Sequence, residues 1–167
     1  MKKVLIASDH AGFEIKKALI ESNKSIPWLD LGAFSTASVD YPDYADQLCQ
    51  RLITETKISL SSGQSSGQST DLSSQKTDEK MELFGVLICG SGQGMAIKAN
   101  RYPEIRAALA FNAEVTGLSR EHNNANVLVL PGRYITPQQA LDFFKIFAET
   151  KFAGGRHSAR VAKLSKT

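Results

Sequence analysis

Short, nearly continuous apolar runs constrain the fold of this chain more than any other feature. Three of them, VLIA at 4–7, GVLIC at 85–89 and VLVL at 127–130, have the length and composition of strands buried on both faces. Longer stretches with helical periodicity separate these runs. An alternation of strand and helix predicts an α/β domain, in which helices cover both faces of a parallel sheet.

Five strands and six helices are expected along the chain. The strands are predicted at 3–8, 28–32, 84–89, 106–110 and 126–130. The helices are predicted at 13–22, 44–56, 94–101, 113–121 and 137–152, and a short C-terminal helix at 157–164 follows Gly154-Gly155. The 167 residues are enough for one domain with a substantial core, so we expect residues 1–167 to form a single domain.

Residues 59–80 interrupt the pattern of strands and helices. They contain eight serines, three glutamines and no aromatic residue, and SSGQ occurs twice in tandem. A segment of this composition buries too little apolar surface to offset the entropy that it loses on ordering. We therefore predict a disordered loop, inserted between a helix and the strand that leads to Cys89.

Composition and charge exclude several classes of protein. No apolar run approaches the ~18 residues that a membrane span needs, and the apolar stretch at 4–7 is too short for the core of a signal peptide. Two cysteines, Cys49 and Cys89, form neither a disulfide framework nor paired metal ligands. We expect a cytoplasmic protein without a membrane partner. Six Lys or Arg and one acid follow residue 144, and this local positive charge suits a small anion better than nucleic acid.

The sequence CGSGQG at 89–94 predicts a binding loop. A glycine-rich turn between a strand and a helix presents backbone N–H groups to an anion. Position 95 is Met instead of the third glycine of a dinucleotide fingerprint, and no Gly-Lys-Ser/Thr follows as in a P-loop. A cradle for a small oxyanion remains. Cys89 is the last residue of the predicted strand, and open α/β sheets bind ligands at this end of their strands. The N-terminus of the following helix favours a thiolate at Cys89. A packing role in the core is the alternative.

Further polar residues are candidates for the site, and those that follow strands are expected near the same edge of the sheet. Asp9 and His10 follow the first strand, although Asp9 is also suited to cap the next helix. Arg133 follows the last strand. Arg156 and Arg160 lie at i and i+4 on one face of the last helix, an arrangement that suits either a bound phosphate or a basic tail in solvent.

His122 ends a helix just before a strand, so we expect it at the opposite edge of the sheet from Cys89 of the same subunit. A histidine in this position commonly caps the helix C-terminus. A catalytic role would instead place it in the site of a neighbouring subunit. The three histidines, His10, His122 and His157, lack metal-ligand spacing, so no metal site is predicted.

Five motifs in order along the chain resemble type B ribose-5-phosphate isomerase, in a family that also holds galactose-6-phosphate isomerase subunits. They are SDHAGFEIK, DYPDYA, ICGSGQGMAIKANR, LSREHNNANVL and GGRHSARV. The resemblance implies a Rossmann-like homodimer or tetramer with active sites shared between subunits and no cofactor. Position 91 is Ser where many members have Thr, and Met95 replaces the Glu base of a second subgroup, so the chain resembles the cysteine subtype.

The resemblance also implies roles for individual residues. Cys89 would be the base that moves a proton between adjacent sugar carbons, and His122 would open the sugar ring with help from Asp9. Backbone N–H groups would hold the enediolate beside the hydroxyl of Ser91, and they belong to the loop Gly90, Gly92, Gln93 and Gly94. Asn123 would contact sugar hydroxyls, and the phosphate would be held by His10, Arg133, Arg156 and Arg160.

The expected function is interconversion of ribose 5-phosphate and ribulose 5-phosphate through an enediolate. An isomerase of a six-carbon phosphate, such as allose or galactose 6-phosphate, would share the fold and the chemistry. A hydrolase that uses Cys89 and His122 is a second alternative, although acyl transfer has no need of the arginines. A non-catalytic phosphosugar-binding module is a third.

Overall fold

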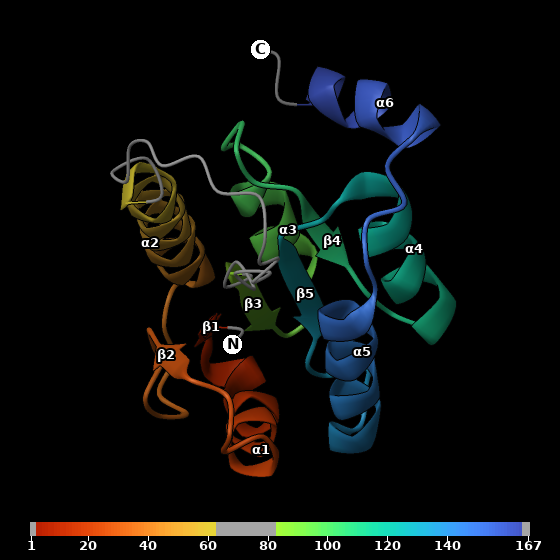
Figure 1. Cartoon of the computed structure of the whole chain (residues 1–167). Coiled ribbons are helices and arrows are strands. Elements are labelled where there is room, and N and C mark those ends of the chain that lie inside the picture. Colours follow the sequence, from red (N-terminus) through yellow and green to blue (C-terminus); the bar gives the residue numbers. More distant parts are fainter. Residues whose placement is uncertain (1–2, 63–82, 165–167) are drawn as a thin grey trace.

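The computed structural model describes residues 3–62 and 83–164, which form a five-stranded parallel sheet between layers of helices (Figure 1). The strands are β1 (Lys3–Ser8), β2 (Trp28–Asp30), β3 (Leu83–Cys89), β4 (Ala107–Leu109) and β5 (Val127–Pro131). The helices are the short 3-10 helix η1 (His10–Gly12), α1 (Phe13–Ser22), α2 (Tyr41–Ser62), α3 (Gln93–Ala99), α4 (Ala113–Asn123), α5 (Pro137–Glu149) and α6 (Arg156–Leu164). The predicted Rossmann-like α/β fold is confirmed.

The order of the strands places a reversal at the centre of the sheet. The order is β2-β1-β3-β5-β4, and every neighbouring pair is parallel. The chain moves from β1 outward to β2, and after β3 it moves outward in the other direction. The reversal therefore lies between β1 and β3, where Ser8 pairs with Ile88 near the carboxyl ends. In open α/β sheets, ligands bind outside the carboxyl ends of the strands at such a reversal.

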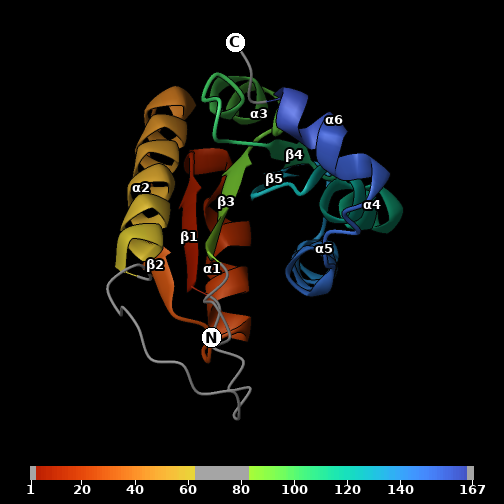
Figure 2. The same ribbon diagram turned by 45° about the horizontal axis from the view of Figure 1, so that its top comes forward.

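The two faces of the sheet carry different helices, and Figure 2 shows α1 and α2 on opposite sides of β1. Val4 and Ile6 of β1 belong to the core that packs against α1 and α5. Leu5 and Ala7, which alternate with them, belong to the core that packs against α2 and α3. Because successive side chains of a strand point to opposite faces, a strand covered on both faces must be apolar throughout. This explains the continuous apolar runs of the sequence.

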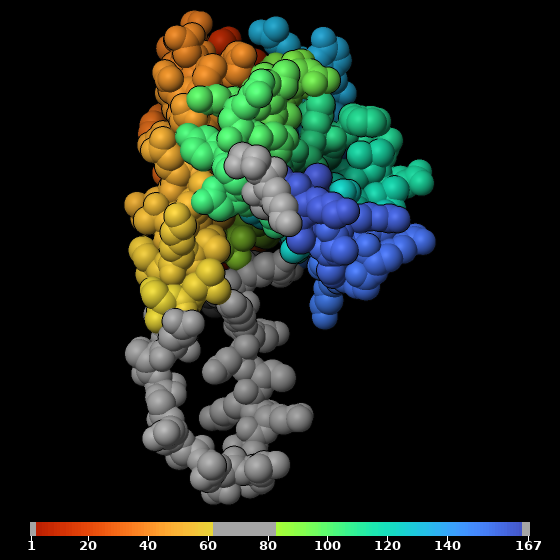
Figure 3. All heavy atoms as spheres, turned by 90° about the horizontal axis from the view of Figure 1, so that it is seen from above, coloured from red at the N-terminus to blue at the C-terminus, as the bar shows by residue number. Residues whose placement is uncertain are grey.

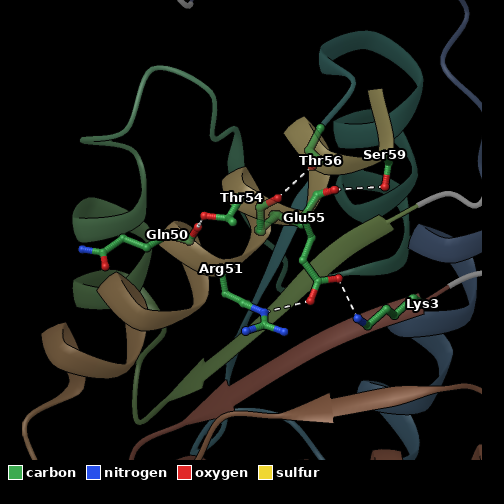
Figure 4. Close-up of polar contacts among 8 residues, drawn as sticks. Lys3, Gln50, Arg51, Thr54, Glu55, Thr56 and Ser59 are labelled. Atoms are coloured by element: carbon green, nitrogen blue, oxygen red, sulfur yellow. Dashed lines mark hydrogen bonds and ion pairs between the residues drawn. The ribbon is translucent and has the colours of Figure 1, made fainter. Parts of the chain in front are cut away.

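Helix α2 is longer than predicted, and the boundary given to the disordered insert was wrong. The helix continues to Ser62, so residues 59–62 are helical. The Thr54, Thr56 and Ser59 hydroxyls each donate to the backbone carbonyl four residues earlier, at 2.8–2.9 Å (Figure 4). Hydroxyls bonded in this way are compatible with a helix. A high content of Ser and Thr was therefore not enough to locate the end of α2. The rest of the predicted insert, 63–80, lies outside the described residues.

An ion-pair network ties α2 to the start of β1. Figure 4 shows the Glu55 carboxylate between Arg51, one turn earlier in α2, and Lys3 of β1. The distances are 2.8 Å from Arg51 Nε and 2.6 Å from Lys3 Nζ. Burial alone would raise the pKa of Glu55, but the hydrogen bonds and charges of Lys3 and Arg51 outweigh it and lower that pKa. The network fixes α2 to the start of β1.

Strand β4 is shorter than predicted, and side chains bond the backbone at its start. The Asn100 side chain pairs with both backbone groups of Ala107, accepting from its N–H at 2.9 Å and donating to its carbonyl at 2.9 Å. The Arg106 N–H donates to the Asn126 side chain at 2.7 Å. Smaller differences of one to three residues affect the ends of β2, β3, β5, α3, α4, α5 and α6.

Gly12 lies where the start of α1 crosses β3 most closely. A Cβ at Gly12 would be 2.5 Å from the backbone oxygen of Ile88, which has little room to move. We expect Gly12→Ala to lower the free energy of unfolding by about 1–3 kcal/mol. Gly117, inside α4, provides a matched control, because its Cβ would come no closer than 3.6 Å to Ile146.

Gly117→Ala should raise the free energy of unfolding by about 0.5–1 kcal/mol, since alanine is the better helix former. Urea unfolding of both variants beside the wild type measures the two changes. A Gly12→Ala variant as stable as the wild type would show that the close approach of α1 and β3 is wrong.

Candidate active site

Three loops meet at the carboxyl edge of the sheet, after β1, β3 and β5. The Asp9 N–H donates to the Ile88 carbonyl at 3.0 Å, so the loop after β1 is joined to the end of β3. The Gly132 N–H donates to the Cys89 carbonyl at 2.9 Å, and the Arg133 N–H donates to the Gly90 carbonyl at 3.0 Å. The structure therefore brings together the residues that were predicted at this edge.

Cys89 is the last residue of β3 and carries a free thiol that is 4% exposed. It lies in the core layer of α2 and α3. The chain then turns sharply, because Gly92 has a φ of 73° and is the N-cap of α3. This left-handed conformation favours glycine, and a side chain at position 92 would also lie 2.4 Å from Leu109 Cδ1. The Ser91 hydroxyl accepts from the Gln93 N–H at 3.3 Å within the turn.

Asp9 and His10 are both fixed by backbone groups. Asp9 is 6% exposed, and its Oδ1 accepts from the N–H groups of Ala11 and Gly12 at 2.9 and 3.0 Å. The predicted capping role is therefore present, while a carboxylate retains further acceptor sites on its second oxygen. Nδ1 of the half-buried His10 accepts from the Val39 N–H at 3.3 Å, so the neutral ring carries its proton on Nε2.

Arg133 extends beside the glycine loop. A Cβ built on Gly90 would lie 3.4 Å from Arg133 Nε. The exposed Arg133 side chain therefore passes close to the backbone of Gly90. A guanidinium beside a turn of backbone N–H groups increases the positive potential of the loop. Together with His10, Arg133 gives this edge the character of an anion site.

The other predicted residues form a second group, on α4 and α6. His122 lies near the end of α4, before β5, and therefore at the opposite edge from Cys89, as predicted. Asn123 follows it, and exposed Arg156 and Arg160 lie on α6, which packs beside α4 (Figure 1). Among the described residues, no hydrogen bond or ion pair joins this group to the glycine loop or to Asp9.

Sequence reasoning missed three aromatic residues around the glycine loop. The Tyr41 ring lies against Gly94, where a Cβ would be 2.4 Å from Tyr41 Cζ. Phe111 and Tyr134, 61% and 75% exposed, line a hollow of about 370 Å³ with Ser91, Gln93, Leu109 and Pro131. Phe111 follows β4 and Tyr134 follows β5. Their positions just after the carboxyl ends of strands could have indicated that they lie near the site.

Cys49, the second cysteine, lies inside α2 and not at the end of a strand. It is fully buried between α2 and the sheet, as predicted for a packing residue. Burial, followed by the negative charge of Asp46, raises the pKa of Cys49 to about 12. The thiol is therefore inert at neutral pH, because the thiolate is the reactive form.

Two further findings concern the described residues as a whole. In 3–62 and 83–164, no three or more His, Cys, Asp or Glu side chains are grouped so that they could hold a metal ion. None of the helices in these ranges has the length and apolar character to cross a membrane.

Comparison with known proteins identifies the class and the family. A family model described as Ribose/Galactose Isomerase matches residues 4–68 and 67–164. The chain is an enzyme of the sugar phosphate isomerase class. It belongs to the ribose/galactose isomerase family, and its resemblance to type B ribose-5-phosphate isomerase is confirmed. This finding speaks against the hydrolase and the non-catalytic binding module.

Individual relatives cover nearly the whole chain. A crystal structure of ribose 5-phosphate isomerase from Thermotoga maritima is 39% identical, with a TM-score of 0.82 over 99% of both chains. Ribose-5-phosphate isomerase B from Mycoplasma genitalium, solved with bound ribulose-5-phosphate, is 31% identical, with a TM-score of 0.78 over 98% of this chain and 93% of that one. Ribose-5-phosphate isomerase B of Escherichia coli is 29% identical, covering 99% of this chain and 95% of its own. Other curated relatives are named as sugar phosphate isomerases without a stated sugar.

Proposed function

We propose that this protein interconverts ribose 5-phosphate and ribulose 5-phosphate through an enediolate, without a metal or organic cofactor. The position of Cys89 carries the proposal, because this thiol lies directly before a glycine turn at the reversal of the strand order. The bound ribulose-5-phosphate of the Mycoplasma genitalium structure supports the choice of sugar.

Cys89 is the proposed general base. Its thiolate removes the proton from C2 of the open-chain aldose, and the electron pair of that C–H bond enters the enediolate. Return of the proton to C1, with loss of the C2 hydroxyl proton and gain of a proton at O1, gives the ketose, so the formula of the sugar phosphate is unchanged. A positioned base contributes roughly 10²–10⁴-fold to such a step. Backbone N–H groups of Gly90 to Gly94 and the Ser91 hydroxyl stabilise the enediolate oxygens, where the negative charge develops.

Ring opening is assigned to His122 of a neighbouring subunit. Within one protomer His122 and Asp9 lie at opposite edges of the sheet, so they meet only if a second subunit contributes one of them. The second carboxylate oxygen of Asp9 would then orient the incoming imidazole. We therefore propose a homodimer or a tetramer, in which the α4–α6 end of one subunit covers the carboxyl edge of another.

The remaining polar residues hold the substrate from both subunits. His10 and Arg133 bind the phosphate from the subunit that provides Cys89, and Arg156 and Arg160 bind it from the neighbour. Asn123 contacts sugar hydroxyls beside His122. Guanidinium groups match phosphate oxygens in geometry and charge. Phosphate binding holds the reacting carbons in place, so binding energy far from the reaction contributes to the rate.

Exposed apolar side chains support an assembly of subunits. Phe111 and Tyr134 border the glycine loop, while Ile97 of α3 and Leu164 of α6 are 58% and 59% exposed. Seen from above in Figure 3, α3 and α6 reach the same surface of the molecule. Large exposed apolar side chains beside a polar site, such as Phe111 and Tyr134, are typical of an interface.

Six-carbon phosphates are the second candidate substrates, because the matching family is described for galactose as well as ribose. We expect kcat/KM for ribose 5-phosphate to exceed that for allose or galactose 6-phosphate by about 10-fold or more, since a pocket fitted to five carbons excludes a sixth. The rates are measured with purified protein in EDTA. A higher kcat/KM for either six-carbon phosphate would assign the enzyme to that sugar instead.

A further inference from the structure

His122 and His157 form a stacked pair of imidazole rings. The ring centroids are 4.3 Å apart, and the ring planes differ by 6°. His122 belongs to the last turn of α4, and His157 belongs to the first turn of α6. The residue proposed to open the sugar ring therefore packs face to face on a second ring, for which sequence reasoning predicted no role.

The segment between α5 and α6 is held so that this contact forms. The Ala153 N–H donates to the Glu121 carbonyl at 2.9 Å, which ties the approach to α6 to the end of α4. Gly154 and Gly155 follow with φ values of 63° and 53°, a left-handed pair that side chains would strain. The His157 N–H donates to the Gly154 carbonyl at 3.0 Å and closes the turn.

A hydrogen bond and the nearby charges favour the neutral form of His157. Arg156 Nε donates to Nε2 of His157 at 3.5 Å, which requires that nitrogen to be unprotonated. Burial and the nearby charges of His122, Arg156 and Arg160 lower the pKa of His157, while Glu121 opposes them. A neutral aromatic ring packs well against His122 in either protonation state, because its face also attracts a cation.

We propose that His157 is a positioning residue for His122. It holds the His122 imidazole in the orientation needed for ring opening, and it joins that imidazole to the helix that carries Arg156 and Arg160. His157 itself touches no reacting atom. This inference rests on the proposed function, in which His122 acts on the closed sugar ring.

Two variants distinguish the contribution of the stacked ring of His157 from that of its nitrogen atoms. His157→Ala removes the stacked ring, whereas His157→Phe keeps a flat ring without nitrogen atoms. The first measurement is kcat and KM for ribose 5-phosphate, which is supplied mainly as a closed ring. The second is deuterium uptake at C1 of ribulose 5-phosphate in D₂O. Uptake needs Cys89 but no ring opening, because the phosphorylated C5 oxygen cannot close a ring.

We expect His157→Ala to lower kcat for ribose 5-phosphate by about 10-fold or more, since a displaced catalytic group loses its alignment. KM should change much less than kcat because Arg156 and Arg160 remain on α6, and deuterium uptake should remain near that of the wild type. His157→Phe should recover most of kcat. Thermal melting of both variants confirms that they are folded.

Three outcomes would overturn the inference. An unchanged kcat in His157→Ala would show that His122 needs no stacked partner. A raised KM together with an equal loss of deuterium uptake would show that His157 only holds α6 for substrate binding. A wild-type protein that neither turns over ribose 5-phosphate nor exchanges ribulose 5-phosphate would overturn the proposed function itself, and this inference with it.

Discussion

The Cys89→Ala variant is expected to lose about 10²–10⁴-fold of the wild-type kcat for ribose 5-phosphate, the usual contribution of a positioned base. Deuterium uptake into ribulose 5-phosphate should fall with it, because both reactions need proton transfer at the same carbon atoms. Ribose 5-phosphate should still bind, since the glycine turn, His10 and Arg133 remain. Steady-state kinetics and titration calorimetry measure the two properties separately.

Cys49→Ala is the matched control for Cys89→Ala. The Cys49 thiol is likewise buried and free of disulfides, and its pKa is raised to about 12, so it cannot supply a thiolate at neutral pH. Its loss should leave kcat unchanged, although the small cavity will cost some stability. Wild-type turnover in Cys89→Ala would show that another group removes the proton.

The features predictable from sequence are those that depend on local patterns. Nearly continuous apolar runs identified β1, β3 and β5, because a strand buried on both faces has no polar positions. Parallel strands share one carboxyl edge, so Asp9, Cys89 and Arg133 could be placed together before their contacts were known. The position of His122 at the other edge followed from the same rule.

The features that escaped prediction depend on particular three-dimensional contacts. The end of α2 was misjudged because a segment rich in Ser and Thr is typical of a loop. In this helix the hydroxyls of Thr56 and Ser59 instead donate to backbone carbonyls of the preceding turn. The stack of His122 on His157 depends on the dihedral angles of Gly154 and Gly155, which a sequence shows only as two glycines. The aromatic residues around the glycine turn come from three separate segments, namely the start of α2 and the loops after β4 and β5.

Mixing two inactive variants tests most directly whether a sugar phosphate isomerase site is shared between subunits. Cys89→Ala lacks the base and His122→Ala lacks the ring-opening group, so each protein alone should turn over ribose 5-phosphate poorly. In a mixed dimer, one site receives Cys89 from one subunit and His122 from the other. Random reassortment of equal amounts makes half of the dimers mixed, so about a quarter of the wild-type turnover should return.

The mixed dimers are formed by refolding the two variants together and are isolated with different affinity tags. Recovery of turnover in the mixed fraction, with none in either parent dimer, is the predicted result. Mixed dimers that form in the expected amount but stay as inactive as their parents would contradict a site built from Cys89 of one subunit and His122 of its neighbour.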